Sequence, residues 1–216
     1  MSRILLIGPP GAGKGTQAKT ISRELGIPHI STGDIFRRMY SKRHPLGVEA
    51  REKYWGPEAG GKLVPDDITI PLVKERLSYE DCKKGFILDG FPRTVQQAIS
   101  LEKFASLDKV IYLTISDEKT IQRIIIRKQC NKCENIYGSY NFPKDNKCCG
   151  KELYRRDDDD PETIGGRLKE YGDKTELLIK YYLDLGKLRT IEGDDYPERV
   201  FENIFKLISL PDHYAL

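Results

Sequence analysis

Residues 4 to 16 read Ile4-Leu5-Leu6-Ile7-Gly8-Pro9-Pro10-Gly11-Ala12-Gly13-Lys14-Gly15-Thr16. An apolar run that enters a glycine-rich turn and continues into a helix is the context of a phosphate-binding loop. Glycines let successive N–H groups converge on an anion, and the positive end of the helix adds to the attraction. Lys14 offers a charge to the β- and γ-phosphates, and Thr16 offers a hydroxyl to Mg²⁺. Gly15 stands where the general pattern has Ser or Thr. A glycine-rich turn without a ligand is the alternative, but the order of these residues favours phosphate.

The bulk composition predicts a soluble protein. The chain has 216 residues, 38% hydrophobic and 32% charged, with a formal net charge of +3. This length suits one substantial domain with insertions or two small domains, and the near-balanced charge gives no argument for nucleic acid. No stretch approaches the ~20 apolar residues of a membrane span. Because the first strand starts within three residues and leaves no room for a signal peptide, we expect a cytoplasmic protein.

Apolar strands alternate with helical segments along the chain. Strands that are apolar throughout, separated by helices, indicate an α/β fold with a parallel sheet covered on both faces. Ligands collect at the carboxyl ends of such strands, where Gly8, Thr32, Asp89 and Ser116 follow. We expect strands over residues 3–7, 28–30, 85–89, 109–115 and 188–191, and helices over 14–25, from 35, 95–103, 117–128, 161–185 and 197–209.

Two regions interrupt this alternation and are expected to be insertions at the ligand edge of the sheet. Residues 31–64 are mostly helical and rich in Arg and Lys, whereas residues 127–158 carry cysteines and aromatics without a long apolar period. The four aspartates at 157–160 are interpreted as a solvated helix N-terminus, part of which orients Arg155 and Arg156.

Arginines stand at strand ends and at the hinges of these insertions. A guanidinium fits two phosphate oxygens and keeps its charge at any pH. One such arginine would be a surface charge, but a cluster of them suits phosphoryl transfer, which needs positioning and charge neutralisation. The set comprises Arg37, Arg93, Arg123, Arg127, Arg156 and Arg167.

Other candidate groups are few. Asp89 ends the apolar run 86–88 and could hold Mg²⁺ through water, or could be a helix cap or an ion-pair partner. There is no Ser-His-Asp or Cys-His arrangement. His29, His44 and His213 are scattered, and surface or packing roles explain them better.

Four motifs occur in order, namely Gly8–Thr16, Ser31–Arg37, Gly61–Val64 and the Leu-Asp-Gly-Phe-Pro-Arg stretch Leu88–Arg93. Together they resemble the adenylate kinases over essentially the whole chain, in the long-lid form with a zinc-type cysteine cluster. The resemblance implies a five-stranded P-loop core over residues 1–30, 65–125 and 160–216, an AMP-binding insertion over 31–64 and a lid over 126–159. It also implies the reaction ATP + AMP ⇌ 2 ADP with Mg²⁺, and we expect the protein to be a monomer.

The resemblance further implies roles for individual residues. Gln97 carries both a donor and an acceptor, so it can read an adenine edge. The ATP-binding residues would be Gly11, Ala12, Gly13, Lys14, Gly15, Thr16, Arg123, Arg127, Ile136 and Tyr137. The AMP-binding residues would be Thr32, Arg37, Lys62, Leu63, Val64, Gly90, Phe91, Pro92, Arg93, Gln97, Arg156 and Arg167. The catalytic charges would be Lys14, Arg93, Arg127, Arg156 and Arg167.

The cysteines suggest a metal site. An odd number of five in a chain without a leader argues against a disulfide framework, and the Cys130-x-x-Cys133 knuckle suits tetrahedral Zn²⁺. The second pair of related zinc lids is also separated by two residues, which here gives Cys149 as fourth ligand and Asn146 as third. The third ligand is therefore open between Cys148, after a local shift, and Asp145. A metal-free lid packed by Tyr137, Tyr140 and Phe142 is the alternative.

Two further departures from the family pattern are visible. The segment 54–60 is longer than usual, so the insertion is expected to close differently. Gly165 and Gly166 replace helix formers ahead of Arg167, and because glycine costs about 1 kcal/mol in a helix interior they are expected to soften it.

Two other functions compete with this interpretation. A UMP/CMP kinase is disfavoured by Thr32, Gln97 and the long lid. A nucleotide-gated module whose zinc knuckle grips nucleic acid or protein is disfavoured because residues 131–151 mix charges instead of forming a basic patch. The expected partners are therefore ATP, AMP and ADP, without nucleic acid or membrane.

Overall fold

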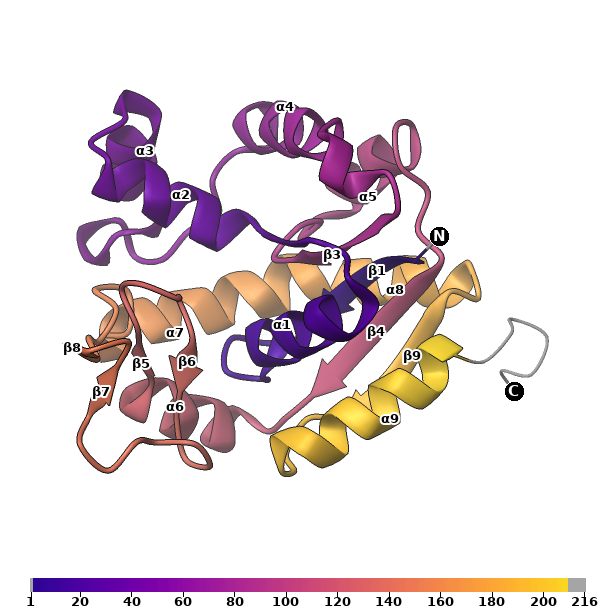
Figure 1. The fold of residues 1–216 in the computed structure, drawn as a ribbon. Coiled ribbons are helices and arrows are strands. Elements are labelled where there is room, and N and C mark those ends of the chain that lie inside the picture. The colour runs from indigo at the N-terminus through magenta and orange to yellow at the C-terminus, as the bar shows by residue number, and fades with distance from the viewer. Residues whose placement is uncertain (1, 210–216) are drawn as a thin grey trace.

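A five-stranded parallel sheet lies at the centre of the molecule (Figure 1). The computed structural model describes residues 2–209, so Met1 and residues 210–216, with His213, lie outside the described residues. The strand order is β2-β3-β1-β4-β9, and each neighbouring pair is parallel, which confirms the predicted α/β class. The strands are β1 (Ser2–Ile7), β2 (His29–Ser31), β3 (Gly85–Asp89), β4 (Lys109–Thr114) and β9 (Leu188–Glu192).

Helices cover both faces of the sheet because side chains of a strand alternate between its faces. Ile4 and Leu6 of β1 pack into one core cluster with residues of α1 (Lys14–Leu25) and α9 (Pro197–Ser209). Leu5 and Ile7 pack into the opposite cluster. That cluster is completed by residues of α4 (Asp66–Leu77), α5 (Val95–Glu102) and α8 (Glu176–Asp184).

The first insertion is a small helical unit above the carboxyl end of the sheet (Figure 1). Its own core is formed by Phe36, Ala50 and Val64, with Tyr54 and Trp55 packed against them. It comprises α2 (Thr32–Ser41), α3 (Pro45–Ala50), a π-helical turn (Arg51–Trp55) and a 3₁₀ turn (Pro57–Ala59). A second 3₁₀ turn (Glu80–Cys82) precedes β3.

The second insertion contains two small antiparallel sheets, which the sequence did not predict. They pair β5 with β6 and β7 with β8. Each strand has only two residues, too short for a periodic pattern to show. The elements, with the helices that flank them, are α6 (Asp117–Ile126), β5 (Lys128–Gln129), β6 (Ile136–Tyr137), β7 (Lys147–Cys148), β8 (Lys151–Glu152) and α7 (Pro161–Glu170).

Three predicted helix boundaries were wrong for local reasons. The second helix begins at Thr32 instead of residue 35, because the Ser31 hydroxyl accepts a hydrogen bond from the Asp34 N–H and caps it. Helix α6 ends at Ile126 because Arg127 has extended backbone. The predicted helix 161–185 is divided into α7 and α8 by a π-helical turn over Tyr171–Thr175. In the described part of the chain, no helix combines the length and apolarity needed to cross a membrane.

Candidate active site

The turn between β1 and α1 has the backbone of an anion-binding loop. Gly11 and Gly13 have φ of 84° and 92°, a region that glycine adopts without strain. A Cβ on Gly8 would lie 2.5 Å from the Leu113 carbonyl oxygen, so the loop approaches β4 closely. The Lys14 ammonium group donates hydrogen bonds to the carbonyl oxygens of Gly8 and Pro9, at 2.7 and 2.8 Å. Lys14 is thereby held across the mouth of the loop.

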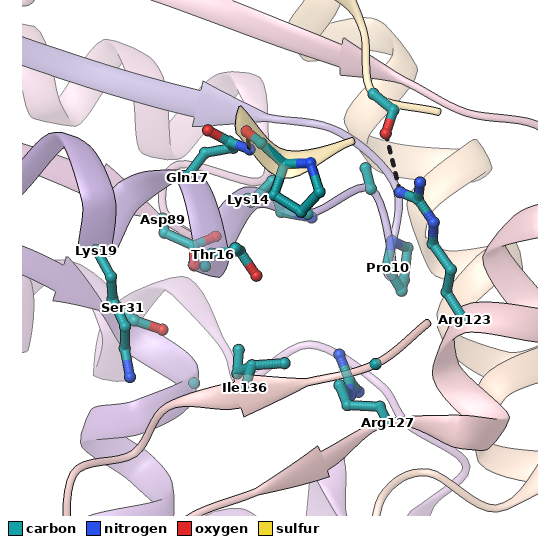
Figure 2. A pocket seen from close by; sticks show the side chains of 18 of the residues that line it. Pro10, Lys14, Thr16, Gln17, Lys19, Ser31, Asp89, Arg123, Arg127 and Ile136 are labelled. Atoms are coloured by element: carbon teal, nitrogen blue, oxygen red, sulfur yellow. Dashed lines mark hydrogen bonds between the residues drawn. The ribbon is translucent and has the colours of Figure 1, made fainter. Parts of the chain in front are cut away.

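The structure explains the glycine at position 15. A Cβ there would lie 3.2 Å from Cδ1 of Ile136 and 3.5 Å from Oδ2 of Asp89. A side chain there would therefore press on Ile136 of the second insertion, whereas its distance to the Asp89 carboxylate is an ordinary van der Waals contact. The next residue, Thr16, carries the hydroxyl instead, and it projects into the same cavity as Asp89 (Figure 2).

Lys14 and Asp89 are both buried and influence each other. Burial, with help from Arg93 and Arg167, lowers the pKa of Lys14 to about 8, against the opposing effect of Asp89. Burial would raise the pKa of Asp89, but His29, whose Nε2 lies 3.5 Å from Oδ2, and Lys14 together hold it below its usual range. Asp89 is consequently an ionised carboxylate at the end of a strand, as a hydrated Mg²⁺ ion requires.

One pocket contains every residue that the resemblance assigned to ATP. It extends from the glycine-rich loop to β6, with Arg123 and Arg127 on one side (Figure 2). The Arg123 guanidinium donates to the Gly193 carbonyl at 2.9 Å and to Asp194 at 3.1 Å, which fixes it at the far end. Sequence reasoning missed Lys19 and Tyr140, which also line this pocket, because neither belongs to a motif.

A second pocket contains most of the residues assigned to AMP. Trp55 and Asp158, which the sequence did not single out, also line it. Gly90 and Arg93 line both pockets, so the two cavities adjoin at the end of β3. The assigned residues found here are Thr32, Arg37, Lys62, Leu63, Val64, Gly90, Arg93 and Gln97.

Four assigned residues lie elsewhere. Arg156 lines the first pocket, whereas Pro92 and Arg167 line a smaller cavity between the glycine-rich loop and α7. Phe91 lines none of these three cavities, because its side chain is fully buried in the core.

Hydrogen bonds within the protein hold the polar side chains of the second pocket in place. Thr32 donates to the Gly90 carbonyl at 2.8 Å, and Gln97 donates to Asp66 at 2.6 Å.

The aspartate run 157–160 is not the solvated helix end that the sequence suggested. Asp158 and Asp159 are 5% and 0% exposed and pair with arginines that converge from separate elements. Arg127 Nε donates to Asp159 Oδ2 at 2.8 Å, and Arg167 Nη1 donates to Asp158 Oδ2 at 3.0 Å. Buried guanidinium groups need anionic partners, which the sequence cannot reveal without the fold. Only Asp160 caps α7 as expected, although Arg155 does donate to the Asp159 carbonyl.

The guanidinium groups of Arg37, Arg93, Arg156 and Arg167 lie close enough to repel one another. Burial and repulsion by Arg37 lower the pKa of Arg156 to about 9, and burial and repulsion by Arg167 lower that of Arg93 to about 10. Burial would raise the pKa of Asp34, but Arg37, at 2.7 Å, and Arg156 lower it to about 2. This concentration of buried positive charge favours a polyanion between the two pockets.

Four cysteine sulfurs converge in the second insertion. Those of Cys130, Cys133, Cys148 and Cys149 all lie within 4.8 Å of one another. The backbone N–H groups of Cys133 and Lys132 lower the pKa of the Cys130 thiol to about 6.

The sulfurs of the adjacent Cys148 and Cys149 lie 3.6 Å apart, and Cys149 has a left-handed backbone, with φ of 54°. Asp145, the other candidate for the third ligand, accepts a hydrogen bond from the Lys147 N–H at 3.2 Å. Asn146, the position that the family spacing gives, accepts one from Lys128 at 3.0 Å.

The fold and the site together define a P-loop phosphotransferase. The family model for adenylate kinase matches residues 6–187. An adenylate kinase of Clostridium novyi is 46% identical over 211 residues, covering 94% of this chain and 96% of that protein. Those of Clostridium botulinum (45% over 215 residues, covering 95% and 98%) and Clostridium kluyveri (46% over 209 residues, covering 93% and 94%) are similarly close.

The chain belongs to the adenylate kinase family. Its activity is the transfer of a phosphoryl group from ATP to AMP, and adenylate kinases use Mg²⁺ with ATP.

Proposed function

We propose that the first pocket of this chain binds ATP and that the adjoining second pocket binds AMP. The observation that carries this assignment is that Gly90 and Arg93 line both cavities beside Lys14. Two phosphate chains that enter from opposite sides would meet there. Positioning of this kind supplies much of the catalysis in phosphoryl transfer.

On the ATP side, the N–H groups of residues 11–16 and the ammonium of Lys14 bind the phosphates. The Thr16 hydroxyl and Asp89, through water, would hold the Mg²⁺ ion, which neutralises charge on the phosphates when bound. Arg123 and Arg127 contact the nucleotide from the base of the second insertion, and Ile136 and Tyr137 cover the adenine.

On the AMP side, Arg37 and Arg93 bind the phosphate, and Lys62, Leu63 and Val64 form the wall around the base. Arg156 and Arg167 stabilise the transferring phosphoryl group. Gln97 reads adenine with the N–H and the lone pair that its contacts to Asp66 and Arg93 leave free.

Residues 31–64 serve as the AMP-binding insertion and residues 126–159 as the lid, on a core of residues 1–30, 65–125 and 160–216. Contacts between these segments support closure over the substrates. Arg38 of the insertion pairs with Glu134 of the lid at 3.0 Å, and Arg51 pairs with Asp157 at 3.2 Å. Closure excludes water, so that the phosphoryl group passes to AMP and not to water.

The four clustered cysteines hold a structural Zn²⁺ ion in the lid. Zinc–thiolate bonds of about 2.3 Å in a tetrahedron place sulfurs under 4 Å apart, and the Cys133–Cys148 and Cys148–Cys149 pairs are separated by 3.5 and 3.6 Å. With four thiolates the site is closed, so it holds the lid together and takes no part in the reaction. The enzyme works as a cytoplasmic monomer.

A substrate panel tests the assignment. ADP formation from ATP is measured with AMP, UMP or CMP as acceptor, with zinc analysis of the same sample. We expect AMP to be strongly preferred and about one zinc per chain. Preference for UMP or CMP would make the chain a pyrimidine nucleotide kinase, and ATP binding without transfer would leave only a binding module.

A further inference from the structure

Two glycine pairs that are distant in the sequence meet in the structure. Gly60 ends the lengthened segment 54–60 of the first insertion, Gly61 begins the motif Gly61–Val64, and Gly165 and Gly166 lie within α7. In Figure 1 the loop that follows α3 lies over the first turns of α7, and the 3₁₀ turn at Pro57–Ala59 contacts that helix. The two departures from the family pattern are therefore one feature of the fold.

The contact between them is backbone against backbone. A Cβ on Gly166 would lie only 2.0 Å from the Gly60 carbonyl oxygen. From the other side, a Cβ on Gly61 would lie 2.7 Å from Cγ of Arg167 and 2.9 Å from the Thr163 carbonyl oxygen. Real Cβ atoms do not approach other atoms this closely, so any side chain at either position would force the loop and the helix apart.

The neighbouring glycines differ in this respect. Cβ atoms on Gly60 and Gly165 would meet nothing within 4 Å among the described residues. Softening of the helix would apply to Gly165 and Gly166 alike, whereas close contact applies only to Gly166. The two explanations can therefore be separated by experiment.

We propose that Gly61 and Gly166 form a docking seat through which the first insertion sets both the AMP pocket and the position of Arg167. Gly61 directly precedes Lys62, Leu63 and Val64, so the seat fixes the wall of the second pocket. Gly61 touches the stem of Arg167, while Asp158 holds its guanidinium at 3.0 Å. The inference rests on the proposed function, because it assumes that this pocket takes AMP.

The decisive comparison is Gly166→Ala against Gly165→Ala. Both remove a glycine from one helix, so both gain similar helix propensity. Overpacking at a close contact predicts that Gly166→Ala raises KM for AMP roughly five- to a hundredfold. KM for ATP should stay within about twofold in both variants, because neither Gly166 nor Arg167 lines the ATP pocket.

A second matched pair tests the seat from the insertion side and serves if Gly166→Ala does not fold. Gly60 and Gly61 have φ of 70° and 68°, so alanine strains both equally. Gly61→Ala should raise KM for AMP well beyond Gly60→Ala. The binding of AMP can be monitored by the fluorescence of Trp55, the only tryptophan. AMP should bind more weakly to Gly61→Ala than to Gly60→Ala.

The outcomes separate the two claims. If the two variants of each matched pair had equal KM values for AMP, the docking seat would be wrong. The proposed function would still stand as long as the wild-type enzyme used AMP. A wild-type enzyme that does not use AMP would remove the proposed function itself. A parallel rise in KM for ATP would show a general structural defect and would also count against the seat.

Discussion

Asp159 is fully buried, and both of its carboxylate oxygens accept hydrogen bonds from Arg127, one of them at 2.8 Å from Nε. The pair ties the segment after α6 to the turn before α7, which are the two ends of the second insertion. Its energetic weight differs from that of a surface ion pair, because removing one partner leaves a charge buried without compensation.

Asp159→Asn should therefore lower the free energy of unfolding by about 3 kcal/mol. Asp157→Asn is the matched control in the same run, since its side chain is 61% exposed and pairs with Arg51 at the surface. That change should cost less than about 1 kcal/mol. Urea unfolding of the two variants measures both values, and similar losses would contradict the distinction.

Lys14→Met should reduce kcat by roughly a hundred- to a thousandfold, the typical effect of removing one preorganised charge from a transition state. The fold should survive, because burial already disfavours the charged ammonium. Lys53→Met, an exposed lysine paired with Glu49, is the control and should keep full activity. Steady-state kinetics and a thermal midpoint for each variant decide the result.

The pKa of Lys14, lowered to about 8, predicts a pH dependence. Phosphate binding needs the ammonium form, so kcat/KM for ATP should fall as pH rises through about 8. The stability effect has the opposite sign. A folded-state pKa below the unfolded value means that stability from this group increases as pH rises above about 8. In Lys14→Arg, kcat/KM for ATP should no longer fall near pH 8. If the fall near pH 8 were unchanged in this variant, it would belong to the titration of another group.

Zinc binding should depend on Cys148, although the family spacing places the third ligand at position 146 instead. Cys148→Ser should lose the metal or bind it far more weakly, and the thermal midpoint should fall because the lid sheets are only two residues per strand. Cys82→Ser is the control, since Cys82 packs in the core away from the cluster. Metal analysis after dialysis distinguishes the variants, and full zinc content in Cys148→Ser would exclude it as a ligand.

Trp55 should report selectively on the second pocket. Its side chain lines that pocket, and its indole nitrogen is buried without a hydrogen-bond partner among the described residues. AMP should change its fluorescence strongly, whereas ATP with Mg²⁺ should change it little. A titration with each nucleotide checks this, and equal responses would contradict the assignment of the pockets.

The sequence predicted the sheet and its helices because these depend on local signals, whereas the grouping of most site residues was implied by the resemblance to the family. The apolar strands and the glycine-rich loop specify their own conformation. The three cavities together account for the predicted nucleotide-binding residues except Phe91. Phe91 shows the limit of a motif, since adjacency in sequence to Arg93 does not tell whether a side chain faces the site or the core.

Features that depend on tertiary contact could not be predicted. The buried state of Asp158 and Asp159 requires arginines brought from α2, α7 and the end of α6. The role of Gly166 requires Gly60, more than a hundred residues earlier, to lie against it. Cys148 joins the cluster because the two-residue strands of the second insertion bring it beside Cys133, which a spacing pattern does not reveal.

Glu134 touches two other parts of the molecule at once. Its carbonyl oxygen accepts a hydrogen bond from Lys19 of α1, and its carboxylate pairs with Arg38 of α2. When the lid is closed, Glu134 therefore favours the closed position of the first insertion. Closure of the first insertion must favour closure of the lid to the same extent. Binding of the two nucleotides should be positively cooperative, but only by a few-fold, because Arg38 is largely solvent-exposed.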